Sequence, residues 1–141
     1  MAITEAMCTS FKQEVLEGVH NLKASGGHTF KIALYTSSAS LDATTTAYAT
    51  SNEVSGTNYD AGGFTLTNKG PETTGTTAVC SFEDAFWNSS SITARGALIY
   101  NSSQSNKAVC VLDFEVDKTS NPDFRIDFPA ETATGALIRF A

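Results

Sequence analysis

The residues with the widest chemical range in this sequence are its two histidines, His20 and His28. An imidazole changes protonation state near neutral pH and binds metals through a ring nitrogen, so each histidine is a candidate for catalysis or metal binding. Neither stands at metal-ligand spacing from a second ligand, and the chain has no Cys-x-x-Cys pair. His20 falls near the end of a predicted helix and His28 before a predicted strand, where structural roles suffice. The sequence therefore predicts no bound metal and no cofactor.

Three acidic residues, Asp113, Glu115 and Asp117, alternate with apolar residues in one stretch. If this stretch is a regular strand, the three carboxylates share one face and form a candidate site for a hard cation such as calcium. The alternative is a solvated acidic face whose repulsion is offset by Lys107 or Lys118. The sequence favours the solvated face.

Nucleophilic catalysis has little support in the residue pattern. Serine is abundant, but no Gly-x-Ser-x-Gly turn occurs, and a Ser-His-Asp triad would have to use one of the two histidines above. The glycine pairs at 26–27 and 62–63 precede predicted strands, whereas a phosphate-binding glycine loop precedes a helix. We therefore expect a protein that is not an enzyme.

The three cysteines, Cys8, Cys80 and Cys110, are too few and too widely spaced for a disulfide framework. We expect them to be small buried hydrophobic residues. Cys80 and Cys110 both fall in apolar segments, so an oxidised pair between them stays open as the alternative.

Aromatic residues and one arginine are the candidates for recognition. Trp87 stands beside Phe86 and near Phe82, and an exposed aromatic cluster of this kind stacks on sugar rings or fills a partner's pocket; packing in the core or between subunits is the alternative. Arg95 interrupts an apolar strand and needs a partner, either within the subunit or across an interface. The candidate interface residues are Arg95, Trp87, Phe86, Tyr48 and Tyr59.

Size and charge exclude several classes of protein. A chain of 141 residues and 14.9 kDa suits a single domain, 1–141. The net charge of −6 and the pI near 4.7 argue against binding to nucleic acid or to an anionic membrane surface. No apolar run reaches the roughly 20 residues of a membrane span, and no signal-peptide pattern opens the chain, so we expect synthesis in a cytosol.

Helical spacing of apolar residues follows a short N-terminal arm, 1–9. Ser10 and Gln13 have the spacing of a capping box, and together with the apolar stripe they predict an amphipathic helix over 10–23. Gly18 falls in the interior of this helix, which therefore needs tertiary contacts to persist. The stripe consists of Phe11, Val15, Leu16, Val19 and Leu22.

The rest of the chain, 29–141, has the two-residue periodicity of strands, beginning with Phe30, Ile32 and Leu34 on one face. Turn residues separate short β-rich runs, without βαβ alternation. The sequence therefore predicts a mainly β fold, an antiparallel β-sandwich or jelly-roll-like domain with one N-terminal amphipathic α-helix. The later strands are predicted at Gly63–Asn68, Thr76–Phe82, Ile92–Asn101, Ala108–Phe114, Phe124–Phe128 and Ala136–Phe140.

A long polar stretch from Thr36 to Tyr59 interrupts this pattern. It is rich in Ser, Thr and Ala, and only Leu41, Tyr48 and Val54 can anchor it. Because it exceeds the length of an ordinary connection, we expect either a functional surface loop or short irregular strands.

Several stretches together resemble a group of small virion structural proteins of tailed bacteriophages. The similarity spans nearly the whole chain, and this group often has a glycine where Glu115 stands here. The stretches are Phe11-Lys12 through Glu17-Gly18-Val19-His20, Phe30 to Ser38, Asn52-Glu53-Val54-Ser55-Gly56 with Tyr59 and Ala61-Gly62-Gly63, Ile92 to Asn101, and Val111-Leu112-Asp113-Phe114.

The resemblance implies a role in a virion assembled in the bacterial host cytoplasm, in many copies, and it carries over no active site. The implied partners are the major capsid protein or other virion proteins, together with further copies of the chain in a homo-oligomer. Within this group we expect a capsid decoration or cement protein, which binds the outer shell and bridges capsid subunits. The alternatives are a tail or head-tail component, or a surface module that binds a receptor or carbohydrate.

Overall fold

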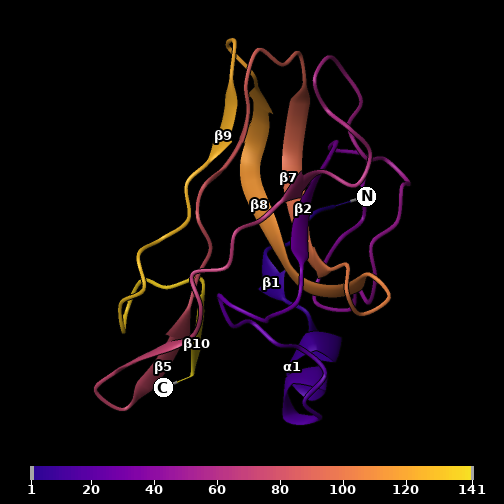
Figure 1. Cartoon of the computed structure of the whole chain (residues 1–141). Helices are drawn as coiled ribbons and strands as arrows, with labels where there is room; N and C mark the ends of the chain where they lie inside the picture. The colour runs from indigo at the N-terminus through magenta and orange to yellow at the C-terminus, as the bar shows by residue number, and fades with distance from the viewer. Residues whose placement is uncertain (1, 141) are drawn as a thin grey trace.

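A computed structural model describes residues 2–140, so Met1 of the predicted arm lies outside the described part. Within that part the chain forms one helix and ten strands, and every strand pair is antiparallel (Figure 1). The predicted fold class, a mainly β sandwich with one helix near the N-terminus, is confirmed. The elements are β1 (Ala6–Met7), α1 (Thr9–Leu16), β2 (Phe30–Tyr35), β3 (Phe64–Thr65), β4 (Glu72–Thr74), β5 (Thr77–Cys80), β6 (Ala85–Trp87), β7 (Thr93–Asn101), β8 (Lys107–Thr119), β9 (Phe124–Ile126) and β10 (Ile138–Phe140).

The main sheet has the strand order β1-β8-β7-β2-β3. β7 and β8 form a long hairpin, and β2 pairs with β7 along its whole length, from Phe30 opposite Asn101 to Tyr35 opposite Gly96. β2 and β7 consist mostly of aliphatic and aromatic residues and are almost entirely buried. The predicted strands at these positions are confirmed.

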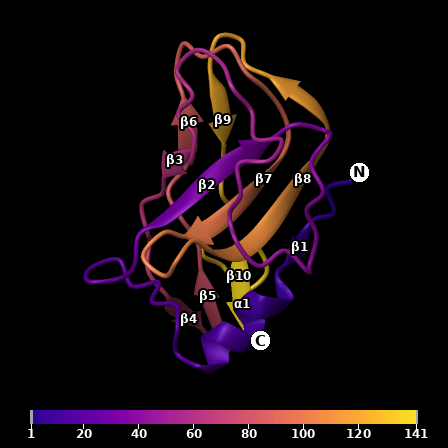
Figure 2. The same cartoon turned by 90° about the vertical axis from the view of Figure 1, so that its right-hand side faces the viewer.

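The second layer consists of two antiparallel pieces, the three-stranded sheet β10-β5-β4 and the pair β6-β9 (Figure 2). Side chains satisfy backbone groups between the two pieces. The Ser81 hydroxyl donates to the Pro129 carbonyl over 2.8 Å, and the Phe128 N–H donates to the Asp84 carboxylate over 3.0 Å. The two pieces therefore act as one layer, although the ladder between them is broken.

One side of the sandwich is closed by backbone hydrogen bonds and the other is not. On the closed side, the segment 64–69 bridges the layers: the Leu66 N–H donates to the Phe30 carbonyl over 2.8 Å, and the Glu83 N–H donates to the Thr67 carbonyl over 3.0 Å. On the opposite side, no backbone hydrogen bond joins β8 to β9 among residues 2–140. We call this gap the open seam; the side chains of Leu112, Phe114, Phe124 and Ile126 line it.

The helix is shorter than predicted at its C-terminal end. It ends at Leu16 because Gly18 adopts a φ of 76°, and the Val19 N–H donates to the Glu14 carbonyl in a Schellman turn. Gly18 is therefore a helix terminator, and Val19 and Leu22 follow the helix although they keep its apolar spacing. The predicted cap is also wrong, since Cys8 occupies the N-cap position and makes no side-chain cap.

The polar stretch 36–59 is packed on the main sheet. Isolated bridges join Leu41 to Ile3, and Glu53 to Tyr35. The predicted anchors Leu41 and Val54 are buried, and Tyr48 is partly buried against the core. The stretch therefore forms short irregular contacts over the outer face of β2, which is one of the two alternatives predicted for it.

All three cysteines are free and buried, which confirms their expected role as small hydrophobic residues. Burial raises the pKa of the Cys8 thiol and of the Cys80 thiol to about 11. Burial also raises the pKa of the Cys110 thiol, with a smaller contribution from Cys8. The oxidised Cys80–Cys110 pair is absent from the described structure.

A bulge interrupts β8 opposite Arg95. Asp113 lies opposite Gly96, whereas Lys118 lies opposite Ala94, so β8 contains extra residues between these pairs. Glu115 within the bulge has a φ of 70°, a left-handed conformation that favours glycine. The bulge breaks the regular alternation on which the shared face of Asp113, Glu115 and Asp117 depended.

The apolar stripe of α1 yields a matched pair of variants. The Phe11 side chain is fully buried, whereas Leu16 is 89% exposed. We expect Phe11→Ala to lower the free energy of unfolding by about 3–5 kcal/mol, since it leaves a core cavity. Leu16→Ala should change it by less than about 0.5 kcal/mol. Urea denaturation measures both, and equal losses would contradict this placement of the helix.

The left-handed Glu115 gives a second stability prediction. Glu115→Gly and Glu115→Ala both remove the carboxylate, but only glycine adopts this backbone conformation without a steric cost. We expect the glycine variant to be more stable than the alanine variant by about 1 kcal/mol. Thermal denaturation of the two variants tests this; an alanine variant as stable as the glycine variant would argue against the bulge.

Candidate interaction surface

The five predicted interface residues lie at different depths. Phe86 is 45% exposed, and Arg95 and Tyr48 are partly buried. Trp87 and Tyr59 are only 6% and 8% exposed. The structure therefore does not bring the five together on one surface, and Phe86 is the member best placed to touch a partner.

Trp87 packs inside the sandwich. Its indole lies 5.9 Å from the Tyr59 ring, 5.7 Å from the Phe64 ring and 5.9 Å from the Phe124 ring, between ring centroids. Phe82 is also fully buried. Core packing, the alternative considered for this cluster, is what the structure shows for Trp87, and a buried indole is not available to stack on a sugar.

Phe86 and Arg125 are cross-strand neighbours on the outer face of the second layer. The Phe86 ring also lies 5.3 Å from the Phe64 ring. The guanidinium of Arg125 is held by Asp84, over 2.8 Å, and by Asp127. Aromatic and arginine side chains dominate the binding energy of protein interfaces, so this patch is the strongest candidate contact surface. The sequence analysis did not select Arg125, because its pairing with Phe86 depends on strand register.

Arg95 makes an ion pair within the subunit. Its Nε donates to the Asp113 carboxylate over 3.1 Å, and the same oxygen accepts the Glu115 N–H over 2.8 Å. The bond from Glu115 is the main cause that lowers the pKa of Asp113, and Arg95 adds to it. Arg95 thus supports the β8 bulge, and its contact with a partner stays a prediction.

Tyr48 and Tyr59 share one carboxylate, that of Glu53. Each hydroxyl donates to it over 2.6 Å, and the Gly62 N–H donates over 2.8 Å. The Tyr59 hydroxyl also accepts the Leu34 N–H of β2 over 2.9 Å. These bonds tie the stretch 36–59 to the main sheet, so both tyrosines have structural roles here. Sequence analysis missed Glu53, although its position between two tyrosines in a weakly charged stretch is a usable signal.

All four tyrosines of the chain lie close enough to Glu53 to feel its charge, and we call them the tyrosine cluster: Tyr35, Tyr48, Tyr59 and Tyr100. The Tyr35 hydroxyl donates to the Ala49 carbonyl over 2.6 Å, the Tyr100 hydroxyl donates to the Gly62 carbonyl over 2.7 Å, and the Tyr48 ring stacks on Tyr100. Burial, followed by the charge of Glu53, raises the pKa of Tyr100 to about 12. Burial and Glu53 raise the pKa of the other three phenols further.

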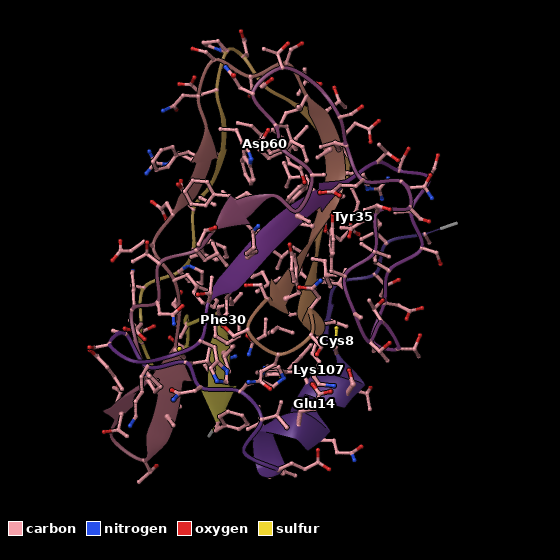
Figure 3. The ribbon with its side chains drawn as sticks, turned by 45° about the vertical axis from the view of Figure 1, so that its right-hand side comes forward. Cys8, Glu14, Phe30, Tyr35, Asp60 and Lys107 are labelled. Atoms are coloured by element: carbon pink, nitrogen blue, oxygen red, sulfur yellow. The ribbon has the colours of Figure 1, made fainter. Side chains whose placement is uncertain are left out.

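The two histidines meet at a buried asparagine. The Asn101 amide nitrogen lies 2.9 Å from His20 Nδ1 and 3.0 Å from His28 Nδ1. His20 Nε2 lies 2.8 Å from the Glu14 carboxylate, which faces Lys107 (Figure 3). His20 follows the helix and pairs with Glu14, which replaces the helix-dipole interaction expected from the sequence. The cluster joins the loop after α1 to the end of β7.

Within residues 2–140, no group of three or more His, Cys, Asp or Glu side chains is arranged to hold a metal ion. The only helix in this part of the chain is too short to cross a membrane. Comparisons with protein-family models, curated proteins and solved structures return no match.

The tyrosine cluster predicts an alkaline transition. A phenol whose pKa is raised by folding binds its proton more tightly in the folded state. Stability is therefore intact below the unfolded tyrosine pKa of about 10 and falls as the pH rises through about 12, the value for Tyr100. Tyrosinate absorbance and circular dichroism should change together in this range; phenols that titrate near pH 10 in a folded protein would contradict it.

Glu53→Gln is the informative variant for this titration, because it removes the charge that opposes phenol ionisation. We expect tyrosinate to form at lower pH in Glu53→Gln than in the parent protein. Glu83→Gln is the matched control, since Glu83 is exposed and contributes to no tyrosine pKa.

Proposed function

We propose that this chain is a non-enzymatic structural protein of a tailed-bacteriophage virion, and within that class a capsid decoration or cement protein. Its partners are then the major capsid protein or other virion proteins, and further copies of itself. The proposal starts from the sequence resemblance, and one backbone observation is compatible with that resemblance.

That observation is the conformation of Glu115. The group that the chain resembles often has glycine at this position, and Glu115 has a φ of 70°, which favours glycine. Neither composition nor periodicity called for a left-handed residue in the middle of a strand. Glu115 is a departure from the group, but its left-handed backbone keeps the conformation that a glycine there would adopt without strain.

The stretches that carry the resemblance also fall on the framework of the fold. They include β2, β7, the turn after α1, and Glu53 with its hydrogen-bond partner Tyr59. A likeness at framework positions supports a common architecture. It leaves the outward surface, where partners bind, free to differ between members.

A decoration protein needs an outward surface for neighbours more than it needs a reactive site. The exposed Phe86 beside Arg125 offers such a contact, and only 17% of the residues are charged. Each contact of this kind is weak, but many copies on a symmetric lattice gain strength through avidity. Multiple weak contacts therefore suit the proposed role.

Copy number in purified particles tests the proposal. Quantitative mass spectrometry should find this chain within a few-fold of the major capsid protein. Counts of about six or twelve per particle would place it in the tail or at the head-tail junction. Absence from purified particles would overturn the virion role.

Phe86→Ala links the surface patch to this role. We expect the variant to fold normally and to occupy fewer sites per particle, because Phe86 is exposed. Phe140→Ala is the matched control, since Phe140 is also exposed but lies on β10, away from the patch. Equal occupancy by Phe86→Ala and the parent protein would remove this patch from the interface.

A further inference from the structure

The open seam leaves the edge of a long strand without a partner. β8 spans Lys107–Thr119, but β1 pairs with it only at Cys110 and Val111. The Asp113 N–H is taken by the Glu5 carboxylate over 3.2 Å. Beyond Asp113, the side of β8 that faces away from β7 pairs with no strand among residues 2–140. The backbone groups of 114–119 that point away from β7 are therefore open to an added strand, apart from the Glu115 N–H, which donates to Asp113.

A second free edge faces the first across the seam. β9 pairs only with β6, so its other edge has no strand partner in the described chain. The segment 64–69 closes the far side of the sandwich, so the free edges of β8 and β9 lie on the same side. A strand placed between them would find hydrogen-bonding groups on both flanks.

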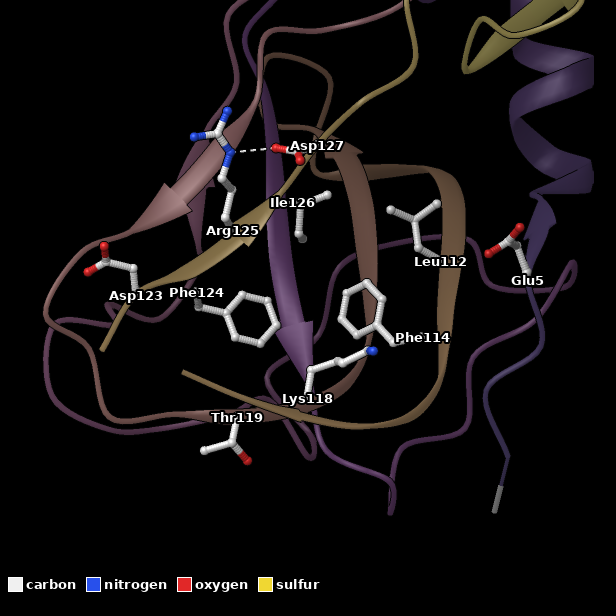
Figure 4. A pocket seen from close by; sticks show the side chains of 10 residues that line it. All are labelled: Glu5, Leu112, Phe114, Lys118, Thr119, Asp123, Phe124, Arg125, Ile126 and Asp127. Atoms are coloured by element: carbon white, nitrogen blue, oxygen red, sulfur yellow. Dashed lines mark hydrogen bonds and ion pairs between the residues drawn. The ribbon is translucent and has the colours of Figure 1, made fainter. Parts of the chain in front are cut away.

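Between the two edges lies a crevice of about 530 Å³ (Figure 4). Its apolar residues are those of the open seam, and the Phe114 and Phe124 rings lie 6.0 Å apart between centroids. A second crevice of about 310 Å³ continues along β8 past Leu112 to Leu137. The second crevice lies where β1 covers β8, so the free floor is the apolar part of the first crevice. An apolar floor suits alternate side chains of an extended segment.

Charge at the rim favours one kind of segment. Arg125 is held by Asp84 and Asp127, whereas Lys118 has no carboxylate within ion-pair distance among residues 2–140. The rim carboxylates already accept hydrogen bonds: Glu5 from the Asp113 N–H and Asp123 from the Ser89 N–H. Lys118 is therefore the cation at the rim without an ion-pair partner, whereas Glu5 and Asp123 each bind a backbone N–H.

We propose that the open seam binds an extended strand from a different protein, with apolar side chains at alternate positions and a carboxylate side chain beside Lys118. The strand pairs with the free edge of β8, and its apolar side chains lie on Phe114 and Phe124. This binding joins the two layers on their open side. The proposal does not depend on the virion role.

Synthetic peptides of roughly eight residues test this, since that length matches 112–119. Each alternates valine, isoleucine or phenylalanine with threonine and ends in glutamate. Binding to the full chain is followed by the fluorescence of Trp87, whose indole lies 5.9 Å from Phe124, and by amide hydrogen exchange. We expect saturable binding by at least one peptide and slower exchange over 114–119.

Two matched comparisons identify the contacts. Lys118→Glu should weaken binding of that peptide by roughly fivefold, because an attraction becomes a repulsion. Lys12→Glu, at an exposed position on α1, should leave it unchanged. The same peptide methylated at alternate backbone nitrogens should not bind, because it cannot donate to a strand edge.

Three results would overturn the proposal. The first is failure of every peptide to bind. The second is equal binding of the methylated peptide, which would identify the seam as a pocket for apolar groups. The third is concentration-dependent self-association that protects 114–119 without peptide, which would make a second copy of the chain the occupant.

Discussion

The Glu53 carboxylate holds the stretch 36–59 in place on the main sheet. The stretch 36–59 has few apolar side chains, so apolar burial alone would hold it weakly against β2. Two phenols and one backbone N–H converge on Glu53, and Tyr59 extends the network to the backbone of β2. Because a partly buried carboxylate is costly to desolvate unless its donors stay in place, this network selects one arrangement of an otherwise permissive segment.

With the stretch 36–59 in place, β2 is buried on both faces. One face packs on the second layer and the other on the stretch 36–59. Phe30 and Ile32 face the second layer, whereas Ala33 and Tyr35 lie under the stretch 36–59. The sandwich is consequently asymmetric. The side next to β2 is closed by the segment 64–69, while β8 at the other side extends well beyond the two residues that β1 pairs with. The open seam follows directly from this difference in strand length.

The sequence predicted elements whose signal is local and missed contacts between distant residues. Apolar periodicity placed β2 and β7 correctly and found the buried first part of β8, because their burial follows from their own composition. The exposed half of β8 beyond Phe114 was not predicted as strand. The helix was predicted to extend too far because Val19 and Leu22 keep helical spacing beyond Gly18. From the sequence alone, a glycine is compatible with the interior of a helix and with its end. The adjacent Phe86 and Trp87 point to opposite faces, and only strand register decides which is buried. Glu53 and Asn101 bind partners from other segments of the chain, and no local sequence pattern predicts such contacts.

The three buried thiols make the native state resistant to alkylation. Only thiolate reacts readily, and with the pKa of Cys8 and Cys80 raised to about 11 the thiolate fraction at neutral pH is small. Cys8 precedes α1, Cys80 ends β5 and Cys110 lies on β8. Each thiol therefore becomes reactive only when its own part of the fold opens, so the chain carries natural reporters of local unfolding in the helix, the second layer and the main sheet.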